Sequence, residues 1–277
     1  MEFEKPLLKK LNKLTPPHHA LTPKQREEAD ISRSAGSATM WICYEDYEVR
    51  EGILNGIGRT KRFYFPMADR GIPNIIYKLN PDNYDDLIDF ARKYGGFGHW
   101  NLCEKQERTG GDPINWIKAH INGIRITFDL IEIIQSNNEE KAYQYIDKLN
   151  ENETYGENEK IVTNKWYSEG SSLDLASYMV RDIINRNIKG IQKKLYQGKE
   201  NTFVSFHKFN ALIEVVYWQL LDAAVSGTFK RCEECNAPVN GNVRFCRPQY
   251  AEKESPCALR SRQRRSRRKR KEEKNEG

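Results

Sequence analysis

The sequence predicts a mainly α-helical protein of the α+β class, with a small β element, a C-terminal four-cysteine zinc finger and a basic helical tail. Three observations predict this arrangement. Apolar residues recur at helical spacing through most of residues 82–225. Four cysteines, Cys232, Cys235, Cys246 and Cys257, follow in the last fifth of the chain. A run of arginine and lysine comes directly after the last cysteine.

The β element is predicted near the N-terminus. Residues 40–47 and 62–65 are rich in aromatic and β-favouring side chains. Asn55-Gly56 lies between them and is a common turn dipeptide. Residues 74–77 are a candidate for a further strand.

Two helices are predicted in the first half of the body. Asp82 or Asn83 can cap a helix that runs to Tyr94 and stops at Gly95-Gly96. Asp112-Pro113 predicts the start of the next helix, with the aspartate as cap and the proline in the first turn. Its apolar face consists of Ile117, Ile121, Ile124, Phe128 and Ile131.

Three more helices are predicted in the second half. The first covers 138–149 and is followed by a polar loop or hinge at 150–160. A long amphipathic helix follows from 173 to about 198. The last runs over 206–225 and ends at Gly227.

These elements define four segments of the chain. Residues 1–40 are expected to be poorly ordered, because they have little apolar surface to bury. Residues 41–227 form the mainly helical domain. The zinc finger covers 228–260 and the basic tail 261–277.

Positive charge is concentrated at the C-terminal end. Residues 258–271 contain nine of the 45 basic residues and no acidic one, which leaves 36 basic and 39 acidic residues elsewhere. Such asymmetry favours a polyanionic partner for one end of the molecule. No export signal is apparent at the start of the chain, and the apolar stretch 209–225 is too short and polar to cross a bilayer. We expect a cytoplasmic protein, in which cysteines bind metal more often than they form disulfides.

The cysteine spacing predicts a structural zinc site. Cys232 and Cys235 form a C-x-x-C knuckle, and ten residues separate each later cysteine from the one before it. Asn240-Gly241 predicts a hairpin of 237–239 with 243–245 that returns Cys246 to the knuckle. Ser255-Pro256 predicts a helix start, which places Cys257 in the first helical turn. Knuckle, hairpin and helix N-terminus together resemble a treble-clef zinc site.

Other interpretations of the cysteines remain open. Free buried thiols have little apolar material around them in this segment, and a redox pair at Cys232 and Cys235 lacks the usual βαβ context. An iron–sulfur cluster accepts the same four ligands. Cys43 and Cys103 stand alone and are expected to be small buried hydrophobic residues.

The basic tail is the predicted nucleic-acid contact. If the helix that starts at Pro256 continues, its arginines suit bidentate contacts to phosphates and to guanine edges. Like charges at i,i+4 oppose an isolated helix, so the tail is expected to fray until it is bound. The alternative is a solubilising or targeting tail. The predicted contact residues are Arg260, Arg262, Arg264, Arg265, Arg267, Arg268, Lys269, Arg270 and Lys271.

With these residues in place, the C-terminus resembles the CGNR-type zinc finger of bacterial proteins. The corresponding residues are the knuckle, Arg244-Phe245-Cys246 and Cys257-Ala258-Leu259-Arg260, within 228–270. Cys-Ala-Leu-Arg stands where that family has Cys-Gly-Asn-Arg, and the gap between the third and fourth cysteines is longer. The resemblance implies a DNA-binding transcriptional regulator in a bacterial cytoplasm.

The function predicted from the sequence is therefore that of a zinc-stabilised, non-enzymatic, DNA-binding regulator. The helical domain is expected to bind an effector, form a homodimer or recruit a partner. An RNA- or ribosome-associated factor with the same finger is the alternative. An enzyme with its active site in the helical domain is a third and less favoured class.

Overall fold

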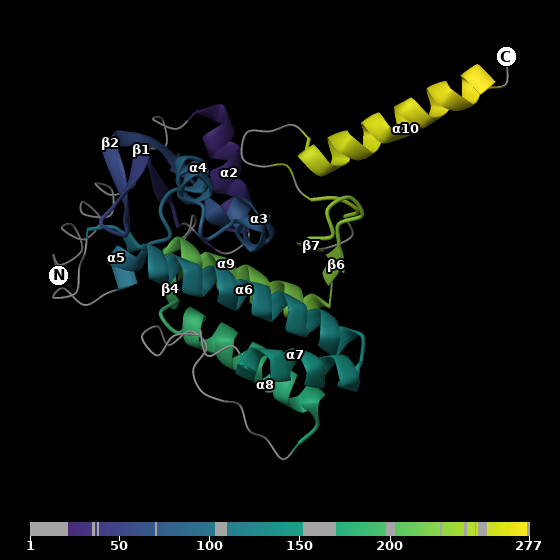
Figure 1. Cartoon of the computed structure of the whole chain (residues 1–277). Helices are drawn as coiled ribbons and strands as arrows, with labels where there is room; N and C mark the ends of the chain where they lie inside the picture. Colours follow the sequence, from purple (N-terminus) through teal and green to yellow (C-terminus); the bar gives the residue numbers. More distant parts are fainter. Residues whose placement is uncertain are drawn as a thin grey trace, which may run out of the picture.

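The computed structural model describes residues 22–34, 37, 39–69, 71–102, 110–151, 170–197, 203–227, 229–240, 243–246, 248 and 254–275. It shows an α+β protein in which helices predominate and three small sheets complete the fold (Figure 1). Among these residues no helix is both long and apolar enough to cross a membrane.

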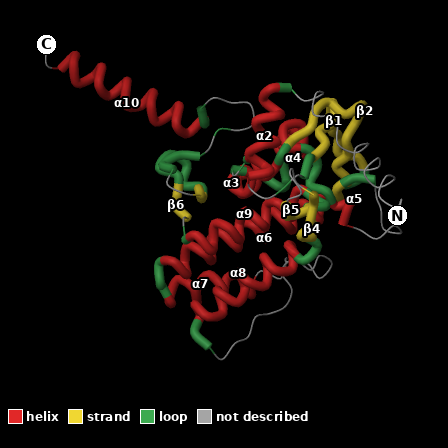
Figure 2. The backbone as a smooth tube through the Cα atoms, turned by 180° about the vertical axis from the view of Figure 1, so that it is seen from behind, coloured by secondary structure: helices red, strands yellow, loops and turns green. Residues whose placement is uncertain are grey.

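Four helices form the centre of the molecule. The longest, α6 (Ile114–Gln135), packs against α8 (Ser172–Ile188) and α9 (Leu212–Ser226), and α7 (Glu139–Glu151) packs against α8. Figure 2 shows the same stack from behind. The predicted isoleucine face of α6 is buried, with Ile117, Ile121 and Ile124 at 0% exposure. This periodicity was sufficient to predict the helix, because apolar residues every three or four positions form one buried stripe.

A long β-hairpin lies beside these helices. Strand β1 (Trp41–Arg50) pairs antiparallel with β2 (Ile53–Tyr64), and the short β3 (Asp112–Pro113) adds to the start of β2. The predicted β element is present, but its turn is at Glu51-Gly52 and not at Asn55-Gly56. Both turn residues have positive φ angles, 53° and 75°. Asn55 instead lies within β2, opposite Glu48.

Short helices connect the hairpin to the core. Helix η2 (Pro66–Ala68), α3 (Ile72–Lys78), α4 (Tyr84–Tyr94) and α5 (His99–Leu102) follow β2. The strand predicted at 74–77 is wrong, since these residues belong to α3. The helix predicted from Asn83 is confirmed: the Asn83 side chain accepts a hydrogen bond from the Asp85 amide, and Gly95 ends the helix with a φ of 86°.

Asp112 does not cap α6. Its carboxylate accepts hydrogen bonds from the amides of Phe97, Gly98 and His99, at 2.6, 2.9 and 2.7 Å. The residue before α6 is Pro113, which offers no side-chain cap. Asp112 thus holds the turn that follows α4. The sequence around Asp112 does not reveal this role, because the amides that it binds lie 13–15 residues earlier in the chain.

The predicted end of the helix from 173 and the predicted start of the helix at 206 are both wrong, because two paired strands occupy the residues between α8 and α9. Helix α8 ends at Ile188 and α9 begins at Leu212. Between them β4 (Gln192–Gln197) pairs with β5 (Phe203–Lys208). The apolar residues of these strands also fit the flanking helical patterns, because short apolar runs are compatible with either period.

The N-terminal segment is only partly described. Within the segment expected to be poorly ordered, residues 23–34 form helix α2 (Pro23–Ser34). Ala29 is 2% exposed and packs with Phe65. Residues 1–21 and most of the loop predicted at 150–160 lie outside the described residues.

Candidate metal centre

The first two cysteines lie in a turn between two short strands. Strands β6 (Phe229–Arg231) and β7 (Pro238–Asn240) pair antiparallel and enclose the knuckle. The Cys232 amide donates to the Ala237 carbonyl at 2.8 Å. The predicted pairing of 237–239 with 243–245 is therefore wrong: β7 pairs with the strand before the knuckle. Residues 243–246 still return to it, since the Glu233 amide donates to the Arg244 carbonyl at 3.0 Å.

The fourth cysteine lies in the first turn of helix α10 (Pro256–Asn275). The Ser255 hydroxyl accepts a hydrogen bond from the Ala258 amide at 3.2 Å, so the predicted helix start is confirmed. Cys257 is 2% exposed. The helix continues through the boundary predicted between finger and tail and extends to Asn275.

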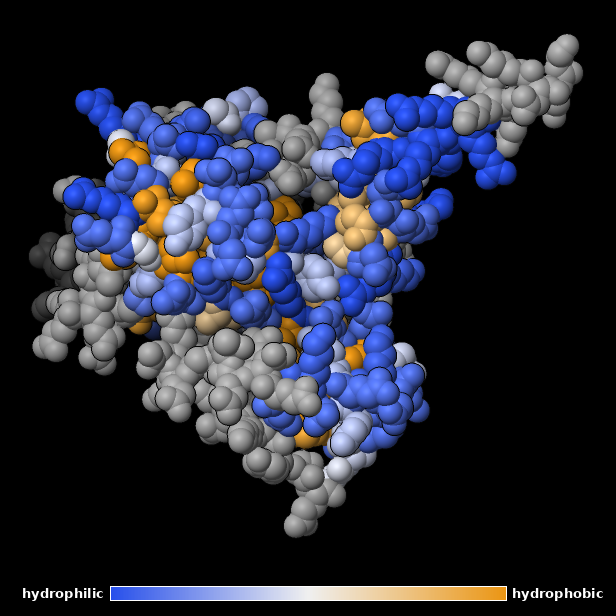
Figure 3. All heavy atoms as spheres, viewed as in Figure 1, coloured by the Kyte–Doolittle hydropathy of each residue, from blue (hydrophilic) through white to orange (hydrophobic). Residues whose placement is uncertain are grey.

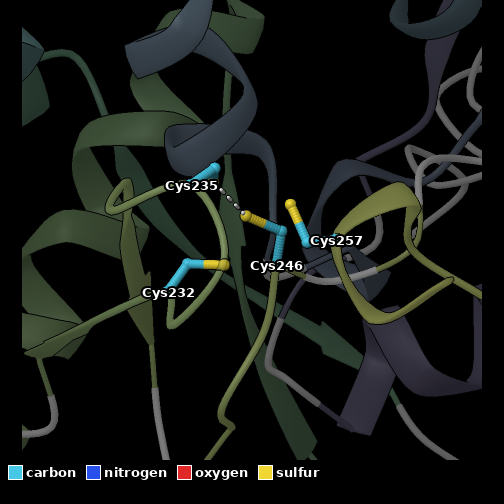
Figure 4. A group of neighbouring side chains, drawn as sticks. All are labelled: Cys232, Cys235, Cys246 and Cys257. Carbon is cyan, nitrogen blue, oxygen red and sulfur yellow. Dashed lines mark hydrogen bonds between the residues drawn. The ribbon is translucent and has the colours of Figure 1, made fainter. Parts of the chain in front are cut away.

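The four sulfur atoms meet at one point. The Sγ atoms of Cys232, Cys235, Cys246 and Cys257 all lie within 4.8 Å of one another, and all four residues are free thiols. Figure 4 shows the side chains converging from the knuckle, the return segment and α10. The Sγ atoms of Cys235 and Cys246 are 3.4 Å apart. An ion held tetrahedrally by four thiolates at about 2.3 Å separates its sulfurs by about 3.8 Å, so this group can hold a metal ion.

Two cations donate to the sulfur atoms. Lys78 Nζ, at the end of α3, lies 2.7 Å from Cys246 Sγ, and Arg260 Nη2 lies 3.3 Å from Cys257 Sγ. Outer groups of this kind orient metal ligands and offset their charge. Lys78 is 168 residues from Cys246 in the sequence and was not predicted as part of the site. No local pattern pointed to it.

The thiols affect one another's protonation. Burial raises the pKa of Cys235, but hydrogen bonds from the Ala237 amide, Cys246 and Lys78 outweigh it and lower the pKa to about 6. Burial raises the pKa of Cys246 above its ordinary value, although Lys78 acts in the opposite direction. Burial raises the pKa of Cys257 as well. One thiolate therefore forms easily while its neighbours resist ionisation, and a bound cation would relieve that resistance.

An arginine attaches the knuckle to the helical core. Arg231 Nε donates to Glu132 Oε2 at 2.6 Å, and Arg231 Nη2 donates to Asp129 Oδ1 at 3.1 Å. Arg231 Nη1 donates to the Tyr77 hydroxyl at 3.2 Å. The cysteine cluster is thus held against α3 and α6.

Helix α10 extends away from the body, and both ribbon views show it projecting into solvent (Figures 1 and 2). Hydrophilic side chains cover it (Figure 3). The predicted contact residues Arg262, Arg264, Arg265, Arg267 and Arg268 are exposed, as is Arg260. The side chains of Lys269, Arg270 and Lys271 lie outside the described residues, although their backbone is helical.

Part of this charge is neutralised within the molecule. Glu234, whose side chain is 6% exposed, pairs with Arg260 and Arg264 at 3.4 and 3.2 Å. Arg262 pairs with Glu254 at 2.9 Å. These pairs link the first turns of α10 to Glu234 and Glu254.

The isolated candidates lie elsewhere. Cys43 is fully buried, and burial raises the pKa of its thiol to about 11, as expected for a small buried hydrophobic residue. Cys103 lies outside the described residues. His120 is buried, and burial followed by the charge of His99 lowers the pKa of its imidazole to about 3. Its Nδ1 lies 3.3 Å from the Tyr217 hydroxyl.

Comparison of the chain with protein-family models, with curated proteins and with solved structures finds no match.

Proposed function

We propose that this protein is a zinc-stabilised nucleic-acid-binding protein that acts in the bacterial cytoplasm as a DNA-binding transcriptional regulator. The observation that carries the proposal is the direct junction of two features. The fourth cysteine of the metal centre occupies the first turn of the helix that carries the arginine run. An ion at this site would fix the base of that helix.

Zinc is the proposed ion, bound by Cys232, Cys235, Cys246 and Cys257. Four thiolates are the commonest ligand set of structural zinc, and they leave no position for a catalytic water. Among its described residues the segment buries a small apolar cluster around Val239, so an ion would be a main source of its folding energy. The similarity of residues 228–270 to the CGNR-type finger supports the same assignment, and a treble-clef arrangement of the finger is part of the proposal.

Nucleic acid is the proposed partner of α10. Its described arginines are exposed, and the helix projects beyond the body (Figure 1). Exposed arginines of this kind supply the phosphate contacts on which nucleic-acid affinity depends. The helix carries no aromatic side chain on which bases could stack, which favours a duplex over a single strand.

Binding of the full-length protein to a labelled DNA duplex tests the proposal. If about six phosphates are neutralised, the affinity should fall by roughly three orders of magnitude between 50 and 200 mM salt. Replacement of Arg264, Arg265, Arg267 and Arg268 by glutamine should remove most of this binding and flatten the salt dependence. A control variant with four body cations, Lys24, Lys118, Lys141 and Lys148, replaced by glutamine loses the same charge and should bind normally. Wild-type protein that fails to bind DNA at 50 mM salt contradicts the proposal.

Metal measurement and competition complete the test. The purified protein should contain one zinc ion per chain, and chelation should abolish DNA binding while the helical signal of the body remains. Duplex DNA should outcompete a structured RNA of equal charge. The reverse order of affinity would assign the finger to an RNA-binding factor.

A further inference from the structure

The two paired strands β4 and β5 form a ribbon that projects from the helical body. Among the described elements, each strand makes extensive contact only with the other. The base of this β4–β5 ribbon is held by His207, whose ring centre lies 4.4 Å from that of Trp218 on α9 and whose carbonyl accepts a hydrogen bond from the Ser37 hydroxyl. Further along the ribbon, Leu195 is 68% exposed and Val204 is 38% exposed. Ribbons of two strands are only marginally stable in water on their own, so contact with a partner would stabilise this one.

Positive charge is concentrated on the β4–β5 ribbon. Residues 189–208 contain five lysines and one acidic residue, Glu200, whereas the chain outside 258–271 has 36 basic and 39 acidic residues. Four of these lysines have described side chains, and all four are exposed. No acidic side chain of the described residues pairs with them, whereas Arg186 near the end of α8 pairs with Asp182 at 2.8 Å. The four are Lys189, Lys193, Lys194 and Lys208.

The strand pairing distributes these lysines over both faces of the ribbon. Lys194 lies opposite Phe206, and Lys208 lies two residues further along β5, so these three residues share one face. Lys193 lies opposite His207 on the other face. The major groove of DNA admits a two-stranded β-ribbon, and the long side chains of lysines can reach the phosphates that border the groove. The shape and charge of the ribbon therefore fit a nucleic-acid duplex.

The ribbon lies at the opposite end of α9 from the finger. Strand β5 ends four residues before α9 begins, and α9 ends three residues before β6 begins. Helix α9 has 15 residues, which corresponds to a length of about 22 Å. Figure 2 shows the ribbon and β6 at the two ends of this helix. The ribbon and α10 are thus two separate cationic surfaces on one chain.

We propose that the β4–β5 ribbon is a second contact for the nucleic acid that binds α10, with its four exposed lysines paired to phosphates. The inference rests on the proposed function and adds to it. Two linked binding surfaces raise the affinity for one long ligand, because binding at the first increases the effective concentration at the second. The lysines of the ribbon position the duplex without reading its sequence, as phosphate contacts do in general.

A salt titration of the full-length, zinc-loaded protein tests the proposal. The ligand is a labelled DNA duplex of about 30 base pairs, which is about 100 Å long and can reach both surfaces. In the lysine variant, all four exposed lysines of the ribbon are replaced by glutamine. The slope of log K against log salt should become shallower by about 3–4, because each phosphate contact contributes about 0.9 to it. The control variant with four other lysines of the body replaced by glutamine loses the same charge and should keep the slope of the wild type.

A photocrosslink locates the contact without a change of charge. Benzoylphenylalanine incorporated in place of Val204, on the face that carries Lys194 and Lys208, should crosslink to the labelled duplex. The same group in place of Tyr143, which is 59% exposed on α7, should not. Zinc content and melting temperature establish that each variant is folded.

The possible results separate the two proposals. An unchanged salt slope in the folded lysine variant, or an equal change in the control variant, overturns the ribbon proposal and leaves the proposed function intact. Equal crosslinking from positions 204 and 143 also overturns it. So does a lysine variant that loses binding to phosphatidylserine vesicles but keeps its DNA binding, because the ribbon would then contact a membrane surface. Absence of wild-type binding to the duplex overturns the proposed function, and the ribbon proposal with it.

Discussion

Lys78 joins the cysteine cluster to the helical body, and its ammonium group contacts both Cys246 and Cys235. Its ammonium group donates to Cys246 Sγ at 2.7 Å although the residue belongs to α3. A divalent ion with four thiolates carries a net charge of −2, which is costly in a half-buried site. Lys78 from α3 and Arg260 from α10 would offset that charge, so the body would contribute to retaining a bound ion.

Replacing Lys78 by methionine should therefore weaken zinc binding by about tenfold, the lower end of the effect of outer-shell partners. Competition with a chromophoric chelator measures this change. The matched control is Lys118→Met. Lys118 lies on α6 and pairs with Asp82, away from the cysteines, so this variant should retain metal as the wild type does. Equal retention by the two variants would limit Lys78 to a role in packing.

His120 is a second residue with a measurable consequence. Because burial lowers the pKa of its imidazole to about 3 from an ordinary 6.5, the unfolded chain binds this proton more readily than the folded one. Stability contributed by the neutral imidazole is present above pH 6.5 and is lost as the pH falls towards 3. At about 1.4 kcal/mol per pKa unit, the loss between pH 6.5 and 4 amounts to roughly 3 kcal/mol.

The His120→Gln variant isolates this effect, because glutamine takes up no proton. Denaturant unfolding of both proteins between pH 6.5 and 4 should show the wild type losing more stability than the variant. Loss of metal at low pH is common to both proteins and cancels in the difference. Burial raises the pKa of Asp112 to about 6 despite its hydrogen bonds from amides, so Asp112 contributes to the pH dependence with the opposite sign. This contribution is also present in both proteins and cancels in the difference. Parallel pH profiles would contradict the assignment.

At the scale of single elements, the β1–β2 hairpin depends on its two turn residues. Gly52 has a φ of 75°, and a Cβ built there would meet no atom within 4 Å. A Gly52→Ala substitution therefore introduces conformational strain without a clash, and it should cost about 1 kcal/mol. Thermal unfolding measures the loss.

Glu51→Asn tests the same turn in the opposite direction. Glu51 also has a positive φ, of 53°, and asparagine followed by glycine is the preferred pair for such a turn. This variant should be more stable than the wild type by a few tenths of a kcal/mol. A gain from Gly52→Ala would mean that the turn adopts another conformation.

Elements with local determinants were predictable from the sequence. The helix from Asn83 to Gly95 contains its own cap, apolar face and stop residue, and the structure confirms all three. The ribbon of β4 and β5 was missed because its strands are stabilised by each other, and their apolar residues fitted the adjacent helices. The turn at Glu51-Gly52 was missed because Asn55-Gly56 had the stronger dipeptide pattern.

The candidate site likewise contains residues that the sequence predicted and residues that it did not. Cysteine spacing brought Cys232, Cys235, Cys246 and Cys257 into one expected cluster, and the structure places their sulfurs together. Their partner strand was misassigned, because Asn240-Gly241 suggested a hairpin downstream. Lys78 and Arg231 were not predicted, because their contacts form only when the finger lies on the body.

At the scale of the whole molecule, Arg231 is one of the residues that attach the finger to that body, together with Lys78. Its guanidinium bonds to Glu132, Asp129 and Tyr77, and its side chain is 26% exposed. Arg231→Met leaves two partly buried carboxylates without their cation. With allowance for the remaining solvent access, detachment should become easier by roughly 1–2 kcal/mol. Hydrogen exchange should accelerate in β6 and β7 and remain unchanged in α8.

Arg244→Met is the matched control, since Arg244 pairs with Glu233 inside the finger. It should leave exchange in β6 close to that of the wild type. Equal acceleration in the two variants would show that the finger loosens internally and does not separate from α6.

The ion pairs of Glu234 would influence any encounter of α10 with a polyanion. A phosphate chain that approaches Arg260 or Arg264 must displace a carboxylate that already lies beside both. In such an encounter the phosphate would replace the Glu234 carboxylate at these arginines. Fewer bound salt ions would then be released than if all nine basic residues of 258–271 were unpaired. If α10 binds nucleic acid as proposed, these pairs would reduce indiscriminate adhesion, and a long residence time would require a target that compensates for the lost internal pairs.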